Sequence, residues 1–196
     1  MFIEDKKTEI PDISSHIRKT PVTKIYEEMD CFVPRRVIRL EYSGPNIREV
    51  ARQAPRILRQ GMMITGTRVY IDDYYVDVTD PNNIVFHIFW HGYRGFDNIS
   101  TMWGWIRLKH GVIHPDGTGS VRIEFYSKLV TEWDRSSILQ RNPIHSLLLK
   151  IYRYIYYDEQ RRKYLSQCQE YSQEMVRRVK ELLKLMETAK LPYPGM

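Results

Sequence analysis

Histidine residues are the first candidates for chemistry in this 196-residue chain. His87 and His91 lie four residues apart, as do His110 and His114, and on a helix this spacing would let two imidazoles bind one zinc ion. The residues around them alternate as in strands, where such positions lie about 13 Å apart at roughly 3.3 Å per residue, too far to share a metal. We therefore predict no metal site within either pair, and leave open a site built from one histidine of each pair on neighbouring strands.

Aspartates, cysteines and known motifs give little support for catalysis. Asp72, Asp73 and Asp77 share one predicted strand, but alternation places Asp72 on the face opposite the other two. The chain has no GxSxG, P-loop or GxGxxG motif, and Cys31 and Cys168 are far apart and outside any CxxC pattern. We predict no disulfide, no cofactor and a cytoplasmic location, and we favour a non-enzymatic protein, although missing motifs do not exclude activity.

Large apolar and aromatic side chains form a second set of candidates. Alternation on the predicted strands and spacings of three and four on the C-terminal helix bring them to facing surfaces. Eight of them would line a cavity for a hydrophobic molecule: Tyr74, Phe86, Trp90, Ile106, Phe125, Tyr164, Tyr171 and Met175. A packed core gives the same pattern, so both interpretations stay open.

A third set combines aromatic and basic residues, which stack on bases and contact phosphates in nucleic-acid-binding proteins. One predicted strand carries four such residues on its outer face, and one predicted helix carries four arginines within an arc of about 80°. They are Trp103, Trp105, Arg107 and Lys109 on the strand and Arg48, Arg52, Arg56 and Arg59 on the helix. An RNA- or ribosome-associated factor is therefore the alternative function, and a solvated helix face gives the same arginine spacing.

The elements that position these residues follow from periodicity and turn residues. Residues 1–33 predict an irregular arm with no more than one short strand, and residues 189–196 a tail. Between them, residues 34–188 predict one α+β domain, in which a curved antiparallel sheet wraps on a long C-terminal helix. Its elements are a strand at 35–42, two short helices divided at Pro55, strands at 66–79, 83–91, 101–113 and 119–133, and a helical segment from Asn142 to Glu187 that bends near Tyr157–Asp158.

Charge and hydropathy argue against a membrane-spanning segment and suggest two further partners, a membrane surface and a second copy of the chain. The formal net charge is +6, and the excess lies in the two ends of the chain rather than in the predicted strands. The run from Leu147 to Tyr157 is interrupted by Lys150 and Arg153 and is shorter than the roughly 20 residues that span a membrane, though it could contact a membrane surface. The apolar stripe from residue 164 to residue 186 could pair with its copy in a homodimer.

The order of one strand, two short helices, antiparallel strands and a long C-terminal helix resembles the helix-grip fold of the START and Bet v 1-like superfamily. The resemblance covers residues 35–188 and includes the helix pair that starts at Gly44-Pro45. It implies a cavity between the curved sheet and the last helix that often holds a hydrophobic ligand. The five predicted strands are fewer than the six or seven usual there. We accordingly predict non-enzymatic binding of a hydrophobic or aromatic small molecule or lipid in this cavity.

Overall fold

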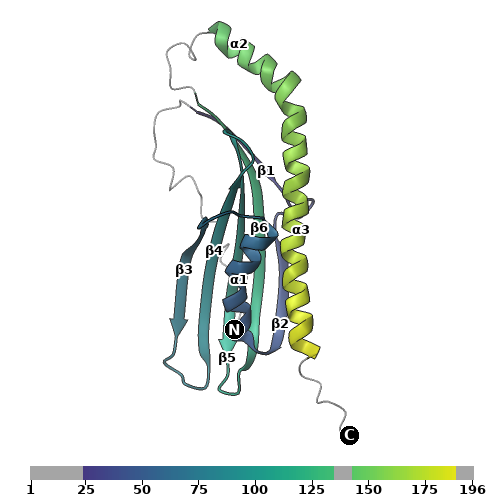
Figure 1. Cartoon of the computed structure of the whole chain (residues 1–196). Coiled ribbons are helices and arrows are strands. Elements are labelled where there is room, and N and C mark those ends of the chain that lie inside the picture. Colours follow the sequence, from purple (N-terminus) through teal and green to yellow (C-terminus); the bar gives the residue numbers. More distant parts are fainter. Residues whose placement is uncertain (1–23, 135–142, 189–196) are drawn as a thin grey trace, which may run out of the picture.

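The computed structural model describes residues 24–134 and 143–188, which form an open six-stranded antiparallel sheet with helices on one side (Figure 1). The predicted α+β class is confirmed. The elements are β1 (Lys24–Asp30), β2 (Ile38–Pro45), α1 (Ile47–Gly61), β3 (Val69–Asp77), β4 (Ile84–Gly95), β5 (Ser100–Ile113), β6 (Thr118–Asp134), α2 (Pro143–Tyr152), the π-helical turn η3 (Arg153–Tyr157) and α3 (Asp158–Thr188). Residues 1–23 of the predicted arm and the predicted tail lie outside the described residues.

The sheet is organised around β6, its longest strand. Strands β3 to β6 form the predicted antiparallel meander, and β3 is the free edge that keeps the sheet open. Along its other side β6 pairs first with β2 and then with β1, so Ile38 lies opposite Phe125 and Lys24 opposite Asp134. The strand predicted at 35–42 is therefore β2, and β1 is the short strand allowed for in the arm.

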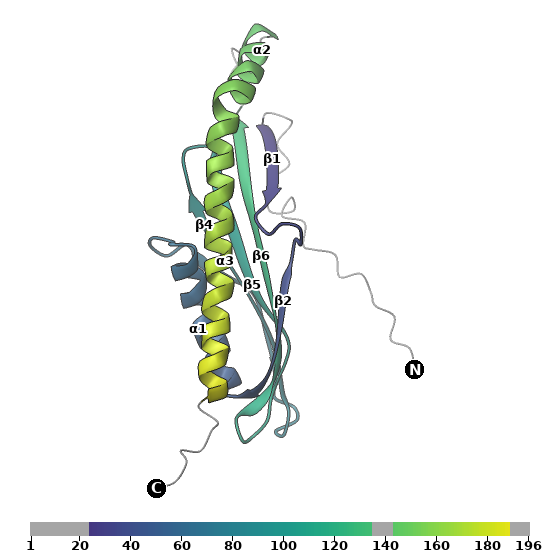
Figure 2. The same cartoon turned by 90° about the vertical axis from the view of Figure 1, so that its right-hand side faces the viewer.

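The core lies between the inner face of the sheet and the two helices α1 and α3, which Figure 2 shows on the same side of the sheet. Phe125 and Ile106 of the sheet and Met175 of α3 are fully buried there. The two helices approach closely because α1 ends in Gly61, where a Cβ atom would lie only 2.9 Å from the Cα atom of Met175. Any larger residue at this position would push the helices apart.

Helix α1 is continuous, which corrects the predicted division at Pro55. The helix runs through this proline from Ile47 to Gly61. A proline removes one helical hydrogen bond and costs about 3 kcal/mol. Residues on both sides of Pro55, including Ala54 and Ile57, are buried in the core, and this burial offsets the cost because it requires one uninterrupted helical face.

The C-terminal helical segment changes course where the sequence predicted a bend. Helix α2 passes into η3, and α3 starts at Asp158; Figure 1 shows α2 turning away from the line of α3. A π-helical turn widens the backbone locally and is a recognised cause of helix bending. The buried Tyr157 fixes this turn to the sheet, because its hydroxyl lies 2.7 Å from Ser100 Oγ and donates to Asp97 Oδ2 at 2.9 Å.

A disulfide joins Cys31 and Cys168, so the prediction of two unpaired cysteines is wrong. Cys31 directly follows β1, and Cys168 lies on the inward side of α3, with 5.6 Å between their Cα atoms. Both side chains are buried. The bond links the N-terminal edge of the sheet to the long helix, and separation in sequence gave no sign of this proximity.

Candidate functional site

Most residues of the predicted ligand cavity belong to a contiguous core. Phe86, Trp90, Ile106, Phe125 and Met175 are all buried and in mutual contact through the cluster that fills the space between the sheet and the helices. This arrangement satisfies the packed-core interpretation of these five positions.

The three tyrosines of the predicted cavity do not meet. Tyr164 and Tyr171 of α3 stack on Phe96, with ring centroids 4.8 and 6.4 Å apart, at the end of β4. Tyr74 pairs across the sheet with Ile88, which is eight residues from Phe96 and thus about 26 Å away along the strand. The structure therefore separates Tyr74 from the helix tyrosines.

An uncovered apolar surface lies on the inner face of β3. Ile71, Tyr74 and Val76 pair with residues of β4 whose side chains enter the core, yet they are 59, 64 and 37% exposed. Figure 1 shows that β3 lies at the edge of the sheet, beside the part that α1 and α3 overlie. The expectation that Tyr74 lies against the last helix is wrong, because the helices do not cover the part of β3 that carries Tyr74 and Val76. We call these three residues the β3 apolar surface.

The outer face of the sheet carries a row of aromatic rings that contact one another. Trp103 contacts Trp105 on one side and Tyr93 on the other, with ring centroids 6.2 and 5.1 Å apart, and Tyr70 stacks on Tyr93 at 6.3 Å. The guanidinium group of Arg107 lies over the rings of two further outer-face residues. These rings cover one another, so Trp105 is only 9% exposed, and little of it is open to stack on a base.

The basic residues of this outer face are largely neutralised. Buried Glu124 forms ion pairs with Lys109 at 3.0 Å and with Arg39 at 3.2 Å. Burial alone would raise the pKa of Glu124, but the hydrogen bond and charge of Lys109, together with Arg39, hold this pKa below its usual range. Lys128 pairs with Glu28 at 2.5 Å. The face therefore offers little net positive potential to phosphates.

The arginines of α1 lie on the other side of the molecule. Arg48, Arg52, Arg56 and Arg59 are all exposed, and Arg52 is paired with Glu49 at 2.8 Å. A Cβ atom at Gly104 would meet Met62, directly after α1, so Gly104 faces α1 and its neighbours Trp103 and Trp105 point away from it. The structure does not bring the two halves of the predicted nucleic-acid site together.

Histidine and aspartate residues at the free edge pair with one another. His87 Nε2 lies 2.5 Å from Asp73 Oδ2, and His91 Nδ1 lies 2.5 Å from Asp72 Oδ1. The alternation that placed Asp72 and Asp73 on opposite faces fails because the register of β3 shifts between Ile71 and Asp73. Among the described residues, no group of three or more metal-binding side chains converges.

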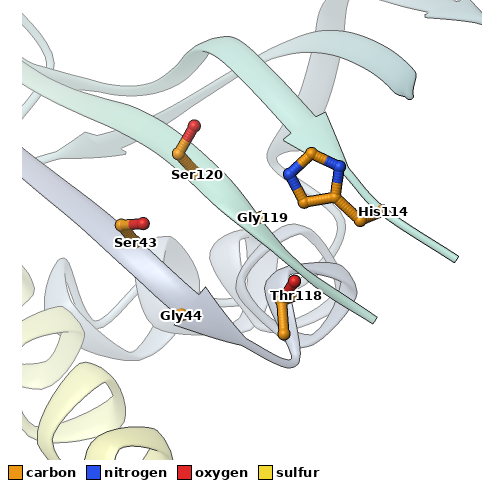
Figure 3. A pocket seen from close by; sticks show the side chains of 6 residues that line it. All are labelled: Ser43, Gly44, His114, Thr118, Gly119 and Ser120. Carbon is orange, nitrogen blue, oxygen red and sulfur yellow. The ribbon is translucent and has the colours of Figure 1, made fainter. Parts of the chain in front are cut away.

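A small depression lies at the end of the sheet farthest from α2, next to the turn between β5 and β6 (Figure 3). It is open to solvent, has a volume of about 250 Å³ and is lined by Ser43, Gly44, His114, Thr118, Gly119 and Ser120. No residue of the predicted ligand or nucleic-acid sites contributes to it. Its lining is mainly polar, so it does not suit a hydrophobic ligand.

Helix α2 and the turn η3 are more exposed than their sequence indicated. Eight large apolar residues there are exposed: Ile144, Leu147, Leu148, Ile151, Tyr152, Tyr154, Ile155 and Tyr156. By contrast, the stripe proposed for a homodimer is used within the chain, since its central residues Cys168, Met175 and Val179 are buried against the sheet and α1. Apolar spacing was visible for both segments, but it does not reveal which one the sheet covers.

Comparisons with known proteins identify no family. No family model matches the chain, and no curated protein matches it. One solved structure, that of an uncharacterized protein from Rhizobium leguminosarum, is similar over 79% of this chain and 98% of its own, with 14% sequence identity and a TM-score of 0.21. Within residues 24–134 and 143–188, no helix combines the length and hydropathy required to cross a membrane.

Proposed function

We propose that this chain is a non-enzymatic binding protein for a hydrophobic or aromatic small molecule or lipid, which it holds on the inner side of its sheet. The sequence suggested a cavity between the sheet and the C-terminal helix. The geometry favours a contact site at the free edge, on the β3 apolar surface. The observation that carries the proposal is the exposure of Ile71, Tyr74 and Val76 on the face of the sheet that elsewhere forms the core.

The energetics of these three side chains support an apolar ligand. An aromatic side chain presents about 150–250 Å², so the 64% of Tyr74 left in water corresponds to about 100–160 Å². Covering that area is worth about 2–4 kcal/mol at roughly 25 cal/mol per Å². Ile71 and Val76 extend the same surface, and no charged residue lies between them on this face. A flat apolar or aromatic molecule suits such a surface.

The test compares two neighbouring tyrosines on opposite faces of β3. Tyr74→Ser removes the inner-face ring, and Tyr75→Ser removes a ring of similar exposure on the outer face. With a fluorescent fatty acid analogue as probe, we expect Tyr74→Ser to weaken binding about tenfold or more and Tyr75→Ser to leave it unchanged. Equal binding by all three proteins, or no binding by the wild type, would contradict the proposal.

Two further expectations from the sequence belong to this proposal. Membership of the helix-grip superfamily is compatible with the open antiparallel sheet and the long C-terminal helix. The expected cytoplasmic location is at odds with the disulfide between Cys31 and Cys168, because reducing compartments keep most cysteines as thiols. Alkylation of the protein in acid-quenched cells tests it. Labelling of both cysteines before reduction supports the cytoplasm, and their protection contradicts it.

A second candidate function is RNA or ribosome binding through α1. The observation that favours it is that Arg48, Arg56 and Arg59 are exposed, with no ion pair to an acidic group among the described residues. Three free guanidinium groups on one helix face attract phosphates, and such binding weakens with salt. If this function holds, we expect the affinity for a single-stranded RNA probe to fall between low and physiological salt. Salt-independent binding, or none, would exclude it.

A further inference from the structure

We infer that α2 and η3 form a surface that docks on an anionic lipid bilayer. This goes beyond the proposed function, because it concerns a different part of the molecule and does not require a bound ligand. The inference starts from the five aliphatic residues of these elements that are exposed: Ile144, Leu147, Leu148, Ile151 and Ile155. They recur at spacings of three and four, so they form one stripe along the helix. We call this stripe the α2–η3 face.

Tyrosines extend the α2–η3 face. Tyr152 and Tyr156 stack on each other with ring centroids 6.1 Å apart, and Tyr154 is 81% exposed. The exposed fractions of the three tyrosines, 50, 81 and 69%, correspond to about 300–500 Å² at roughly 150–250 Å² per aromatic side chain. The five exposed aliphatic residues add to this area, so the surface is at or above the roughly 300–600 Å² of the largest apolar patch on an ordinary monomer. Tyrosine is enriched where a protein meets the boundary between lipid headgroups and acyl chains. The composition is therefore that of an interfacial helix.

The charge of this segment complements an anionic surface. Between Pro143 and Tyr157 the chain contains Lys150 and Arg153 and no aspartate or glutamate. A second copy of the same segment would bring like charges together with no acid to pair with them, whereas acidic lipids attract basic residues. Charge therefore favours a bilayer over a second copy.

The position of α2 makes such docking sterically straightforward. Figures 1 and 2 both show α2 at one extremity of the molecule, beyond the end of the sheet. A flat surface can therefore meet α2 before it meets the strands. The buried hydroxyl of Tyr157, with its bonds to Ser100 and Asp97, fixes the base of this projection to the sheet. The α2–η3 face is thus held away from the body and directed outward.

The experiment is vesicle cosedimentation of the full chain, with phosphatidylcholine vesicles that contain about one third phosphatidylserine or none. The test variant replaces Leu148 and Ile155, 59 and 65% exposed, by glutamine, a good helix former. The matched control replaces Val78 and Val85, exposed residues outside the helices. We expect the wild type to bind the anionic vesicles, salt to weaken that binding, and L148Q/I155Q to lower affinity about tenfold or more. The control should bind as the wild type does.

Three outcomes would overturn the inference. The first is that the wild type does not bind anionic vesicles. The second is that L148Q/I155Q, with an unchanged melting temperature, binds as well as the wild type. The third is that sedimentation shows a dimer that this variant converts to a monomer, which would make a second copy the occupant. If the double variant does not fold, Tyr154→Gln tests the same surface, because that ring is almost wholly in solvent.

Discussion

Removing the disulfide between Cys31 and Cys168 should cost this protein a large share of its stability. The bond closes a loop with a sequence separation of 137, and in the chain-entropy description a loop of that size stabilises the folded state by about 5 kcal/mol. Single domains have total stabilities of about 5–15 kcal/mol. We therefore expect the reduced protein to lose a third or more of its free energy of unfolding, and its melting temperature to fall by about 10–20 °C.

The assay is urea denaturation of the oxidised wild type, the reduced wild type and the variant C31A/C168A. The chain has only two cysteines, so any effect of a reductant comes from this bond. The alanine variant should match the reduced protein within about 1 kcal/mol, because the residues are small and leave small cavities. Dithiothreitol should have no effect on the variant, which serves as its own control.

Two results would refute this reasoning. If reduction lowers the free energy of unfolding by less than about 1 kcal/mol, the closed loop does not restrict the unfolded chain as the entropy argument requires. If both cysteines of the unreduced, urea-unfolded protein react with iodoacetamide, the bond is absent. In that case the close approach of Cys31 to Cys168 is only a packing contact between two buried side chains.

Three smaller perturbations follow from the packing and the charges. Tyr157→Phe should lower the free energy of unfolding by about 1–3 kcal/mol, because Ser100 and Asp97 lose their hydrogen bonds to the hydroxyl. A change below about 0.3 kcal/mol in urea denaturation would show that these bonds do not hold η3 to the sheet. Gly61→Ala should cost about 1–3 kcal/mol because its Cβ atom would press on the backbone of Met175, and an unchanged melting temperature would show that the helices can separate freely. The lowered pKa of Glu124 stabilises the fold above the ordinary glutamate value of about 4.3, and this stability is lost as the pH falls through the folded pKa. Stability should therefore decline less steeply below about pH 4 in Glu124→Gln, and equal declines would contradict this.

The meander could be predicted because its signals are local. Period-two alternation and the turn residues around Pro81 and Pro115 placed β3 to β6 within a few residues of their observed bounds. The bend in the C-terminal segment was also local, since the tyrosine-rich run gives way to charged residues at Asp158. Local signals failed at Pro55, where burial of both halves of α1 outweighs the preference of proline for a helix break.

The candidate surfaces depended on information that the sequence does not contain. Alternation correctly placed Tyr74 on the same face as the core residues of β4, but it could not show that the helices leave the part of β3 around Tyr74 uncovered. Likewise, the apolar spacing of Leu148 and Ile155 resembles that of Met175, and only the three-dimensional arrangement shows that Met175 is buried while the other two are exposed. The disulfide was missed for the same reason, because Cys31 and Cys168 meet only in the folded chain.

The central place of β6 in the sheet also affects how the chain is made. Both N-terminal strands, β1 and β2, take β6 as their pairing partner, and that strand begins only at Thr118. A ribosome therefore releases two strands long before the surface that completes them exists. During that interval their backbone groups are open to pairing with other nascent chains. The backbone groups of β1 and β2 thus stay unpaired while the second half of the chain is synthesised, and slow translation through β6 would prolong that interval.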